Sequence, residues 1–171
     1  MRDLTAHIRS IPDFPKPGIV FRDITPLLAN GPAWRACIDR LVERYQGRVD
    51  TVVGIDARGF LVGGALAYSL GCGLTVVRKS GKLPAETLAA DYGLEYGTDR
   101  LEIHRDAFAP GSRVLLVDDL LATGGTARAA LGLIRQLQGE VVEVAFLVEL
   151  LSLGGRQNLA PHEAFALMQF E

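Results

Sequence analysis

Two adjacent acids followed by a glycine turn are the residues of this chain whose types and spacing point most directly to chemistry. Asp118 and Asp119 come after the apolar run 114–117 and before the segment 123–126, which reads TGGT. The run is short and uniformly apolar, which is typical of a strand buried on both faces in a parallel sheet. We therefore expect the acids at the carboxyl end of a strand, where open parallel sheets bind their ligands.

The turn that follows the acids indicates an anion site. Apolar residues recur at helical spacing after it until Gly139, so the segment predicts a strand, a glycine loop and a helix. Backbone N–H groups of residues 123–126 at the start of that helix could hold a phosphate monoester, with threonine hydroxyls as further donors. The competing interpretation is a plain turn with a solvated acid pair. Adjacent carboxylates after a buried strand repel each other, which favours a cation or a hydroxyl-rich ligand beside them.

Two better-known glycine motifs fit this chain less well. A nucleotide-binding P-loop requires GxxxxGK[ST], and the segment ATGGTAR has no lysine at that place. A dinucleotide fold prefers GxGxxG after its first strand, whereas the turn there reads GIDARGF. We therefore favour a binding site for a phosphate monoester over these two nucleotide-binding motifs.

Composition limits the class of protein. The chain has 171 residues, 49% of them hydrophobic, which predicts one domain with a substantial core. A net charge of -2 gives no electrostatic case for nucleic acid or an anionic membrane, and no apolar run reaches membrane length, so we expect a cytoplasmic protein. Cys37 and Cys72 have no CxxC partner and are expected as buried thiols. The three histidines are isolated, so no structural zinc is indicated.

Predicted strands and helices alternate along the chain. The proline-rich segment 11–26 is not regular helix and is a candidate binding loop. Residues 80–99 break the alternation with glycines, a proline and acids, and predict a mobile hairpin or lid, with 100–108 as a candidate edge strand. The expected helices are 32–47, 60–71 and the one after the TGGT turn; the other expected strands are 51–56, 74–79, 141–150 and 165–170.

The motifs together resemble a known family. VLLVDDLLATGGTA resembles the phosphoribosyl pyrophosphate motif of type I phosphoribosyltransferases, and IPDFPKPGIVFRDITP, DARGF, RKSGKLP, LEYG and LVEL look like the adenine phosphoribosyltransferases in that order. The resemblance implies a single α/β domain over 1–171 with the parallel-sheet type I fold. It also implies an N-terminal helix and base-binding hood over 1–30 and a flexible lid hairpin over 80–106.

The resemblance implies a reaction and its partners. Adenine and phosphoribosyl pyrophosphate would give AMP and pyrophosphate in purine salvage, in a homodimer. Magnesium (Mg2+) would be held mainly by the diphosphate, without direct protein ligands, in the neighbourhood of Asp118 and Asp119.

Site residues follow from the same resemblance. Asp118, Asp119 and Leu120 correspond to the ribose region, and the 5′-phosphate residues are Ala122, Thr123, Gly124, Gly125 and Thr126. Arg58 corresponds to a catalytic pyrophosphate-binding position, with an ordinary salt bridge at a strand end as the alternative. Lys79 and Lys82 would meet the leaving pyrophosphate, unless they are solvated surface lysines.

Two further groups complete the expected site. Val20, Phe21 and Arg22 correspond to the adenine pocket, although plain core packing explains Phe21 equally well. Glu95 corresponds to the catalytic acid/base on the lid, with Tyr96 as its aromatic neighbour; an exposed acid on a flexible loop is the alternative.

Three other functions compete with this one. Hypoxanthine-guanine members of the family carry an aspartate where this chain has Ala122, so alanine favours adenine. A regulator that only senses phosphoribosyl pyrophosphate would need an output module, and no basic DNA-binding segment is visible. A phosphoacceptor signalling domain also places acids at strand ends and has no support beyond the acid pair.

Overall fold

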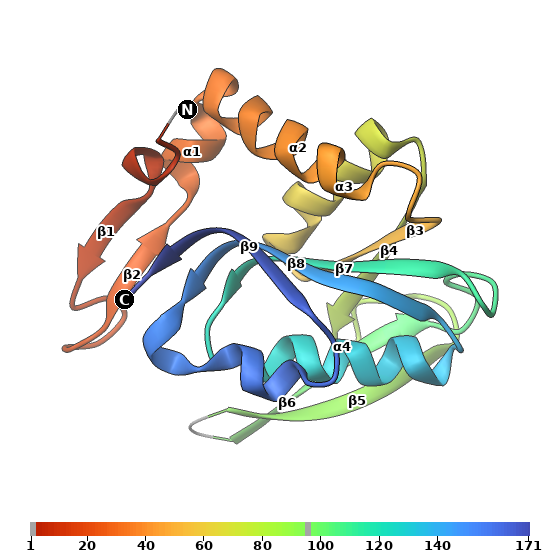
Figure 1. Ribbon diagram of the computed structural model, residues 1–171. Helices are drawn as coiled ribbons and strands as arrows, with labels where there is room; N and C mark the ends of the chain where they lie inside the picture. Colours follow the sequence, from red (N-terminus) through yellow and green to blue (C-terminus); the bar gives the residue numbers. More distant parts are fainter. Residues whose placement is uncertain (1–2, 95–96) are drawn as a thin grey trace.

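The computed structural model describes residues 3–94 and 97–171, in which strands and helices alternate (Figure 1). The N-terminal part comprises a 3-10 turn η1 (Thr5–His7), β1 (Arg9–Pro12), β2 (Val20–Asp23), α1 (Thr25–Ala29) and α2 (Gly31–Tyr45). The middle comprises β3 (Thr51–Ile55), α3 (Gly59–Leu70), β4 (Gly73–Lys79), β5 (Thr87–Leu94) and β6 (Gly97–His104). The last part comprises β7 (Arg113–Leu121), α4 (Gly125–Gln136), β8 (Glu140–Leu150), the 3-10 turns η2 (Leu151–Leu153) and η3 (Gly155–Leu159), and β9 (Ala164–Phe170).

A seven-stranded sheet in the order β5-β6-β4-β3-β7-β8-β9 forms the centre. β4, β3, β7, β8 and β9 pair in parallel, and the β5–β6 hairpin continues the sheet antiparallel to β4. Helices α2 and α3 cover one face and α4 covers the other (Figure 1). The predicted α/β fold with a central parallel sheet is confirmed.

The central strand β7 is buried on both faces, as its composition predicts. Leu115 and Val117 pack into the core on the side of α2 and α3, while Val114 and Leu116 pack into the core on the side of α4. These side chains alternate between faces because successive residues of a strand point in opposite directions. Pairing with β8 continues through Leu121, so Asp118 and Asp119 lie within the last part of the strand and not beyond its end.

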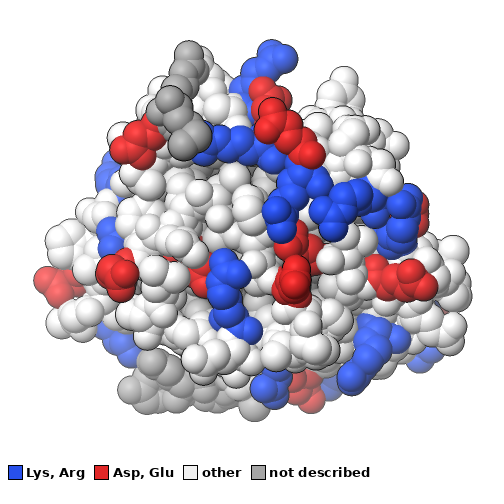
Figure 2. All heavy atoms as spheres, in the orientation of Figure 1, with Lys and Arg blue, Asp and Glu red and all other residues white. Residues whose placement is uncertain are grey.

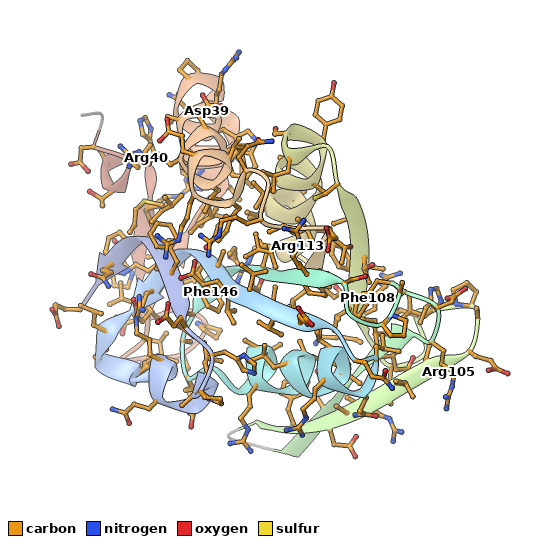
Figure 3. All side chains as sticks on the ribbon, turned by 45° about the vertical axis from the view of Figure 1, so that its right-hand side comes forward. Asp39, Arg40, Arg105, Phe108, Arg113 and Phe146 are labelled. Carbon is orange, nitrogen blue, oxygen red and sulfur yellow. The ribbon has the colours of Figure 1, made fainter. Side chains whose placement is uncertain are left out.

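The amino ends of β3 and β7 are tied together by one ion pair, whose arginine is labelled in Figure 3. The guanidinium of Arg113 contacts the carboxylate of Asp50 at 2.7 Å, and the backbone N–H of Arg113 donates to the same carboxylate at 2.8 Å. These hydrogen bonds lower the pKa of Asp50 to about 2. The two strands are parallel neighbours, so fixing their start also aligns the carboxyl ends that form the site.

The order of the hairpin strands differs from the prediction. The segment 100–108 was the candidate edge strand, but β6 lies between β4 and β5, and β5 forms the edge. Leu101 and Ile103 of β6 are 1% and 0% exposed, because their side chains pack into the core on the side of α4. The glycine and acidic residues around β5 concealed the alternation of its own apolar residues.

A separate two-stranded sheet, β1 and β2, stands beside the main sheet at the N-terminal end (Figure 1). It replaces much of the loop expected over 11–26, and the helix expected at the N-terminus is the single turn η1. Arg9 contacts Asp23 across the pair at 2.6 Å, and Asp23 also accepts from the backbone N–H of Thr25 at 2.9 Å. These contacts fix the sheet to the start of α1.

Two sequence-level expectations concern thiols and membrane helices. Cys37 is a buried free thiol, and burial raises its pKa to about 11. Cys72 is also free but only half-buried, in contrast to the expectation of full burial. Within the described residues, no helix has both the length and the apolar character needed to cross a membrane.

Candidate active site

Parallel pairing of β3 and β7 places the turn 56–58 beside the acid pair. The Nε of Arg58 lies 2.6 Å from the Oδ2 of Asp119, whose side chain is 5% exposed. A Cβ on Gly59 would lie 2.9 Å from the carbonyl oxygen of Val117 and 3.0 Å from the Oδ1 of Asp118. Only glycine allows so close an approach. The alternative interpretation of Arg58 was an ordinary salt bridge, and such a salt bridge is present. Its partner is Asp119, so the salt bridge also places Arg58 in the predicted site.

The two acids form an electrostatically strained pair. Burial raises the pKa of Asp118 well above the usual value, and the charge of Asp119 raises it further. Burial also raises the pKa of Asp119, while the Arg58 guanidinium opposes that increase. The backbone N–H of Asp119 donates to the Oδ1 of Asp118 at 2.8 Å. The charge of Asp119 therefore opposes the ionisation of Asp118, as the sequence indicates, and the Arg58 guanidinium lies where it favours the ionised form of Asp119.

The TGGT turn forms a small hollow at the start of α4. Its volume is about 80 Å³, and its walls include the predicted phosphate residues 122–126 together with Leu121 and Phe146. Phe146, labelled in Figure 3, comes from β8. Gly124 has a φ of 82°, a left-handed conformation that suits glycine, and α4 begins at the next residue. The hollow is therefore a cradle of backbone groups at a helix N-terminus, which favours an anion.

A distant segment of the chain, the 3-10 turn η3, packs against this cradle. The side-chain amide of Asn158 donates to the carbonyl oxygen of Thr123 at 2.7 Å. A Cβ on Gly124 would lie 2.6 Å from the carbonyl oxygen of Gly155, and one on Gly155 would lie 2.2 Å from the carbonyl oxygen of Ala122. Two backbone segments therefore meet with no room for a side chain between them. Neither Gly155 nor Asn158 was predicted, because no motif around them indicates this contact.

The acid pair opens onto a cleft of about 390 Å³. Its walls include Arg58, Asp118, Asp119, Lys79 and Thr126, with Asp56, Ala57 and Tyr92. The predicted pyrophosphate, ribose and phosphate residues thus come together at one edge of the sheet. Lys82 is the exception: its side chain is exposed and does not line this cleft, and its carbonyl oxygen accepts from Arg78 at 3.3 Å.

Sequence reasoning missed Tyr92 and Asp99 of the hairpin: Tyr92 lines this cleft, and Asp99 contacts the cleft residue Lys79. The Nζ of Lys79 lies 3.1 Å from the Oδ2 of Asp99, and the hydroxyl of Tyr92 donates to the same oxygen at 3.0 Å. Burial, and then the hydrogen bond to Asp99, raises the pKa of Tyr92 to about 12. The alternation of Leu88, Ala90 and Tyr92 was the available sequence signal. These contacts join the β5–β6 hairpin to Lys79 at the edge of the cleft.

The N-terminal sheet brings an apolar surface toward Arg58. The guanidinium carbon of Arg58 lies 5.5 Å from the ring centre of Phe21, and Phe14 packs edge-on against Phe21 at 5.3 Å. Val20 is 45% exposed and available for contact. Arg22 turns elsewhere: its Nη1 donates to Ser10 at 2.6 Å, and its guanidinium lies 4.4 Å from the ring centre of Phe170. Its side chain therefore fixes β2 to β1 and to the C-terminal strand.

The predicted acid/base Glu95 and its neighbour Tyr96 lie outside the described residues. The hairpin that carries them, β5 and β6, borders the cleft through Tyr92. Their roles remain predictions.

Comparison with known proteins agrees with the fold and the motifs. The model of the family described as phosphoribosyl transferase domain matches residues 25–165. An adenine phosphoribosyltransferase of Chloroflexus aurantiacus is 58% identical over 170 residues, which cover 99% of this chain and 98% of that protein. One from Methylobacillus flagellatus is also 58% identical, over 99% of this chain and 98% of that protein.

Solved structures show the same likeness. The adenine phosphoribosyltransferase of Thermoanaerobacter pseudethanolicus matches with a TM-score of 0.94 at 51% identity, over 98% of both chains. That of Saccharomyces cerevisiae, in complex with an imino-altritol bisphosphate and adenine, matches with a TM-score of 0.91 at 41% identity, over 96% of both chains. This agreement in sequence and structure covers nearly the whole chain, including the cradle and the cleft. The chain belongs to the adenine phosphoribosyltransferases, enzymes of pentosyl transfer with the type I phosphoribosyltransferase fold.

Proposed function

We propose that the cleft at the carboxyl edge of the sheet is where this chain transfers the 5-phosphoribosyl group from phosphoribosyl pyrophosphate to adenine, giving AMP and pyrophosphate in purine salvage. The observation that carries the proposal is the meeting of three groups in one place. A backbone cradle for a phosphate, a buried acid pair and the cation Arg58 lie along the ends of β3 and β7. A ribose that carries a phosphate on one side and a diphosphate on the other requires these groups in this order: a phosphate site, acceptors for the sugar hydroxyls, and a cation for the diphosphate.

The cradle and the acid pair hold the phosphoribosyl group. Residues 122–126 bind the 5′-phosphate through backbone N–H groups and threonine hydroxyls. Asp118, Asp119 and Leu120 lie next to the cradle, on the side of the ribose hydroxyls. Hydroxyls that donate to the carboxylates would offset the burial and the repulsion that raise the pKa of Asp118.

Arg58 and Lys79 act on the pyrophosphate side. Arg58 uses its Nε toward Asp119, and its side chain is 43% exposed, so its terminal nitrogens remain available to the diphosphate. Lys79 would exchange Asp99 for the leaving group. Lys82 reaches the pyrophosphate only if the segment after β4 moves, because its side chain does not line the cleft.

Magnesium is proposed to arrive with the diphosphate. Within residues 3–94 and 97–171, no group of at least three His, Cys, Asp or Glu side chains is arranged to hold a metal. Asp119 is engaged by Arg58, and Asp118 has a raised pKa, so the pair is a poor independent metal site but a suitable neighbour for a cation bound by the substrate. The ion supplies charge neutralisation to the leaving pyrophosphate.

Adenine would lie between the N-terminal sheet and the cleft. Phe21 already packs over Arg58, and the exposed faces of Val20 and Phe14 extend this apolar surface. A flat base fits such a surface, with backbone groups of residues 20–22 for recognition. The yeast relative has adenine bound in its crystal structure. Ala122 in place of an aspartate supports adenine over hypoxanthine or guanine.

Glu95 is proposed to accept the proton that the purine loses when the new glycosidic bond forms. Glu95→Gln keeps the shape and removes the base, so turnover should fall roughly 10² to 10⁴-fold, with a smaller effect on binding. Single-turnover kinetics with adenine would measure this. A wild-type rate for the chemical step would remove Glu95 from the mechanism without affecting the proposed reaction.

A homodimer in the cytoplasm completes the proposal. Leu61 and Tyr68 of α3 are 50% and 90% exposed, and Leu74 of β4, which lies close to Gly63 and Gly64 of the same helix, is 46% exposed. Leu61 and Tyr68 lie seven residues apart on one helix face, so the three side chains form an apolar surface suited to a second copy. Cys37 and Cys72 remain free, as is usual in a reducing compartment.

One assay tests the proposed reaction. The protein is mixed with magnesium, phosphoribosyl pyrophosphate and adenine, hypoxanthine or guanine in turn, and nucleotide is measured. AMP from adenine, with little product from the other bases, is expected. Formation of another nucleotide, or none, would contradict the proposal.

A further inference from the structure

A hollow of about 310 Å³ on the outer side of α4 shares no lining residue with the cleft at the acid pair. Arg128, Gly132 and Asn158 also line an adjoining hollow that includes Thr123 and Gly125, whereas Leu131, Arg135 and His162 line only the first. One wall is a single face of α4, because its residues recur at helical spacing: Arg128, Leu131, Gly132 and Arg135. The other wall is the end of η3 and the turn after it, residues 158–162. The volume falls at the lower end of the range of about 300–1,000 Å³ for small-molecule sites.

The rim of this hollow is basic. Arg128, Arg135 and His162 line it, and no acid does. Within the described chain, neither arginine side chain has an ion pair or hydrogen bond. By contrast, Arg9, Arg44, Arg113 and Arg156 each pair with a carboxylate at 2.7 Å or less. Figure 2 shows basic and acidic side chains along the lower part of the molecule, where α4 and the β5–β6 hairpin lie in Figure 1.

The floor of the hollow is apolar. Leu131 and Leu159 are 5% and 1% exposed, and Pro161 adds a flat wall. A cationic rim over an apolar floor matches a molecule with a phosphate group and an apolar body. A bare anion would leave the floor without contact.

We propose that this hollow is a second anion site, separate from the catalytic cradle, which binds a small phosphate monoester with an apolar or aromatic body. Arg135 and Arg128 hold the phosphate, His162 adds a ring donor, and the floor receives the body. Asn158 lines the hollow and donates to Thr123, so the site adjoins the rear of the cradle. This proposal is independent of the reaction assigned to the cleft.

The test uses phenyl phosphate as probe and phenol as its uncharged counterpart. Nuclear magnetic resonance of isotope-labelled protein follows the backbone amide of Leu131 for the new site and that of Gly125 for the cradle. Arg135→Gln removes a charge-assisted contact and should weaken the response at Leu131 about 10- to 100-fold. Arg35→Gln is the matched control, because Arg35 lies on α2, over the opposite face of the sheet (Figure 1).

A steric variant complements the charge variant. A Cβ on Gly132 would meet no atom within 4 Å, so Gly132→Gln places a longer side chain at the hollow without a clash at its Cβ and keeps both arginines. It should abolish phenyl phosphate binding at this hollow, as reported by the amide of Leu131. Glutamine is also a better helix former than glycine, so folding should be retained.

Saturable movement of the Leu131 amide with phenyl phosphate, lost in Arg135→Gln and in Gly132→Gln but not in Arg35→Gln, supports the site. Three results would overturn it: movement confined to Gly125, an equal response to phenol, or an unchanged affinity in Arg135→Gln. Each is independent of whether the enzyme turns over.

Discussion

Gly155 lies outside every motif of the sequence, yet the structure predicts that it controls the shape of the phosphate cradle. In Gly155→Ala the new Cβ would lie 2.2 Å from the carbonyl oxygen of Ala122 and 2.8 Å from the Cδ1 of Leu121. Cβ contacts under 3.0 Å are essentially never found, so the Ala122 carbonyl must move by about 0.8 Å, the difference between the two distances. The Ala122 carbonyl belongs to the backbone, so a rotamer change gives no relief.

The displacement should affect catalysis more than folding. Movement of this size at a substrate-positioning group reduces rates by about 10²-fold. Overpacking in a core costs about 1–3 kcal/mol, which a domain of this size tolerates. We therefore expect a folded variant with a loss in kcat/KM for phosphoribosyl pyrophosphate on the order of 10²-fold.

Steady-state kinetics and urea denaturation measure the two effects. Gly31→Ala is the matched control, because its Cβ meets no atom within 4 Å, and its kinetics should match those of the unmodified chain. If Gly155→Ala keeps both the wild-type kcat/KM and the wild-type stability, the backbone contact does not constrain the cradle and the reasoning is refuted.

Three further predictions address the cradle, the acid pair and the core. Thr123→Val removes a hydroxyl donor and should weaken AMP binding by roughly 1.5–3 kcal/mol in calorimetry; an unchanged affinity would contradict a phosphate role. Asp118→Asn should be more stable than the unmodified chain at neutral pH, because the raised pKa of Asp118 means that its ionisation destabilises the fold. Urea denaturation should show this advantage shrinking as the pH falls toward 3.8, the ordinary value; a pH-independent difference would reject the electrostatic cause. Tyr45→Phe removes the hydroxyl that donates to buried Glu143 at 2.6 Å, and the free energy of unfolding should fall by about 1.5–3 kcal/mol in urea; no loss would show that Arg44 alone satisfies Glu143.

The sequence by itself determined most of the strands and helices around the main site and indicated the chemistry that we propose for it. Strand β7 and helix α4 follow from apolar residues at strand and helix spacing, which is a local property of the chain. The acid pair lies in the last part of β7 and the TGGT turn leads from that strand into α4, so their proximity is also local. The family motifs supplied Arg58 and the order of binding segments, and parallel strand ends are where such residues meet.

The tertiary structure decided which distant residues touch. The salt bridge from Arg58 to Asp119, the hydrogen bond from Asn158 to Thr123 and the place of β6 inside the sheet all join segments that no spacing relates. A strand's alternation shows that it has a buried face but does not identify its neighbours, so the edge was assigned to the wrong hairpin strand. The role of Gly155 could not be predicted from the sequence either, because glycine is common in turns. Only the packing of residues 121–124 against it shows that a side chain at position 155 would collide with the cradle.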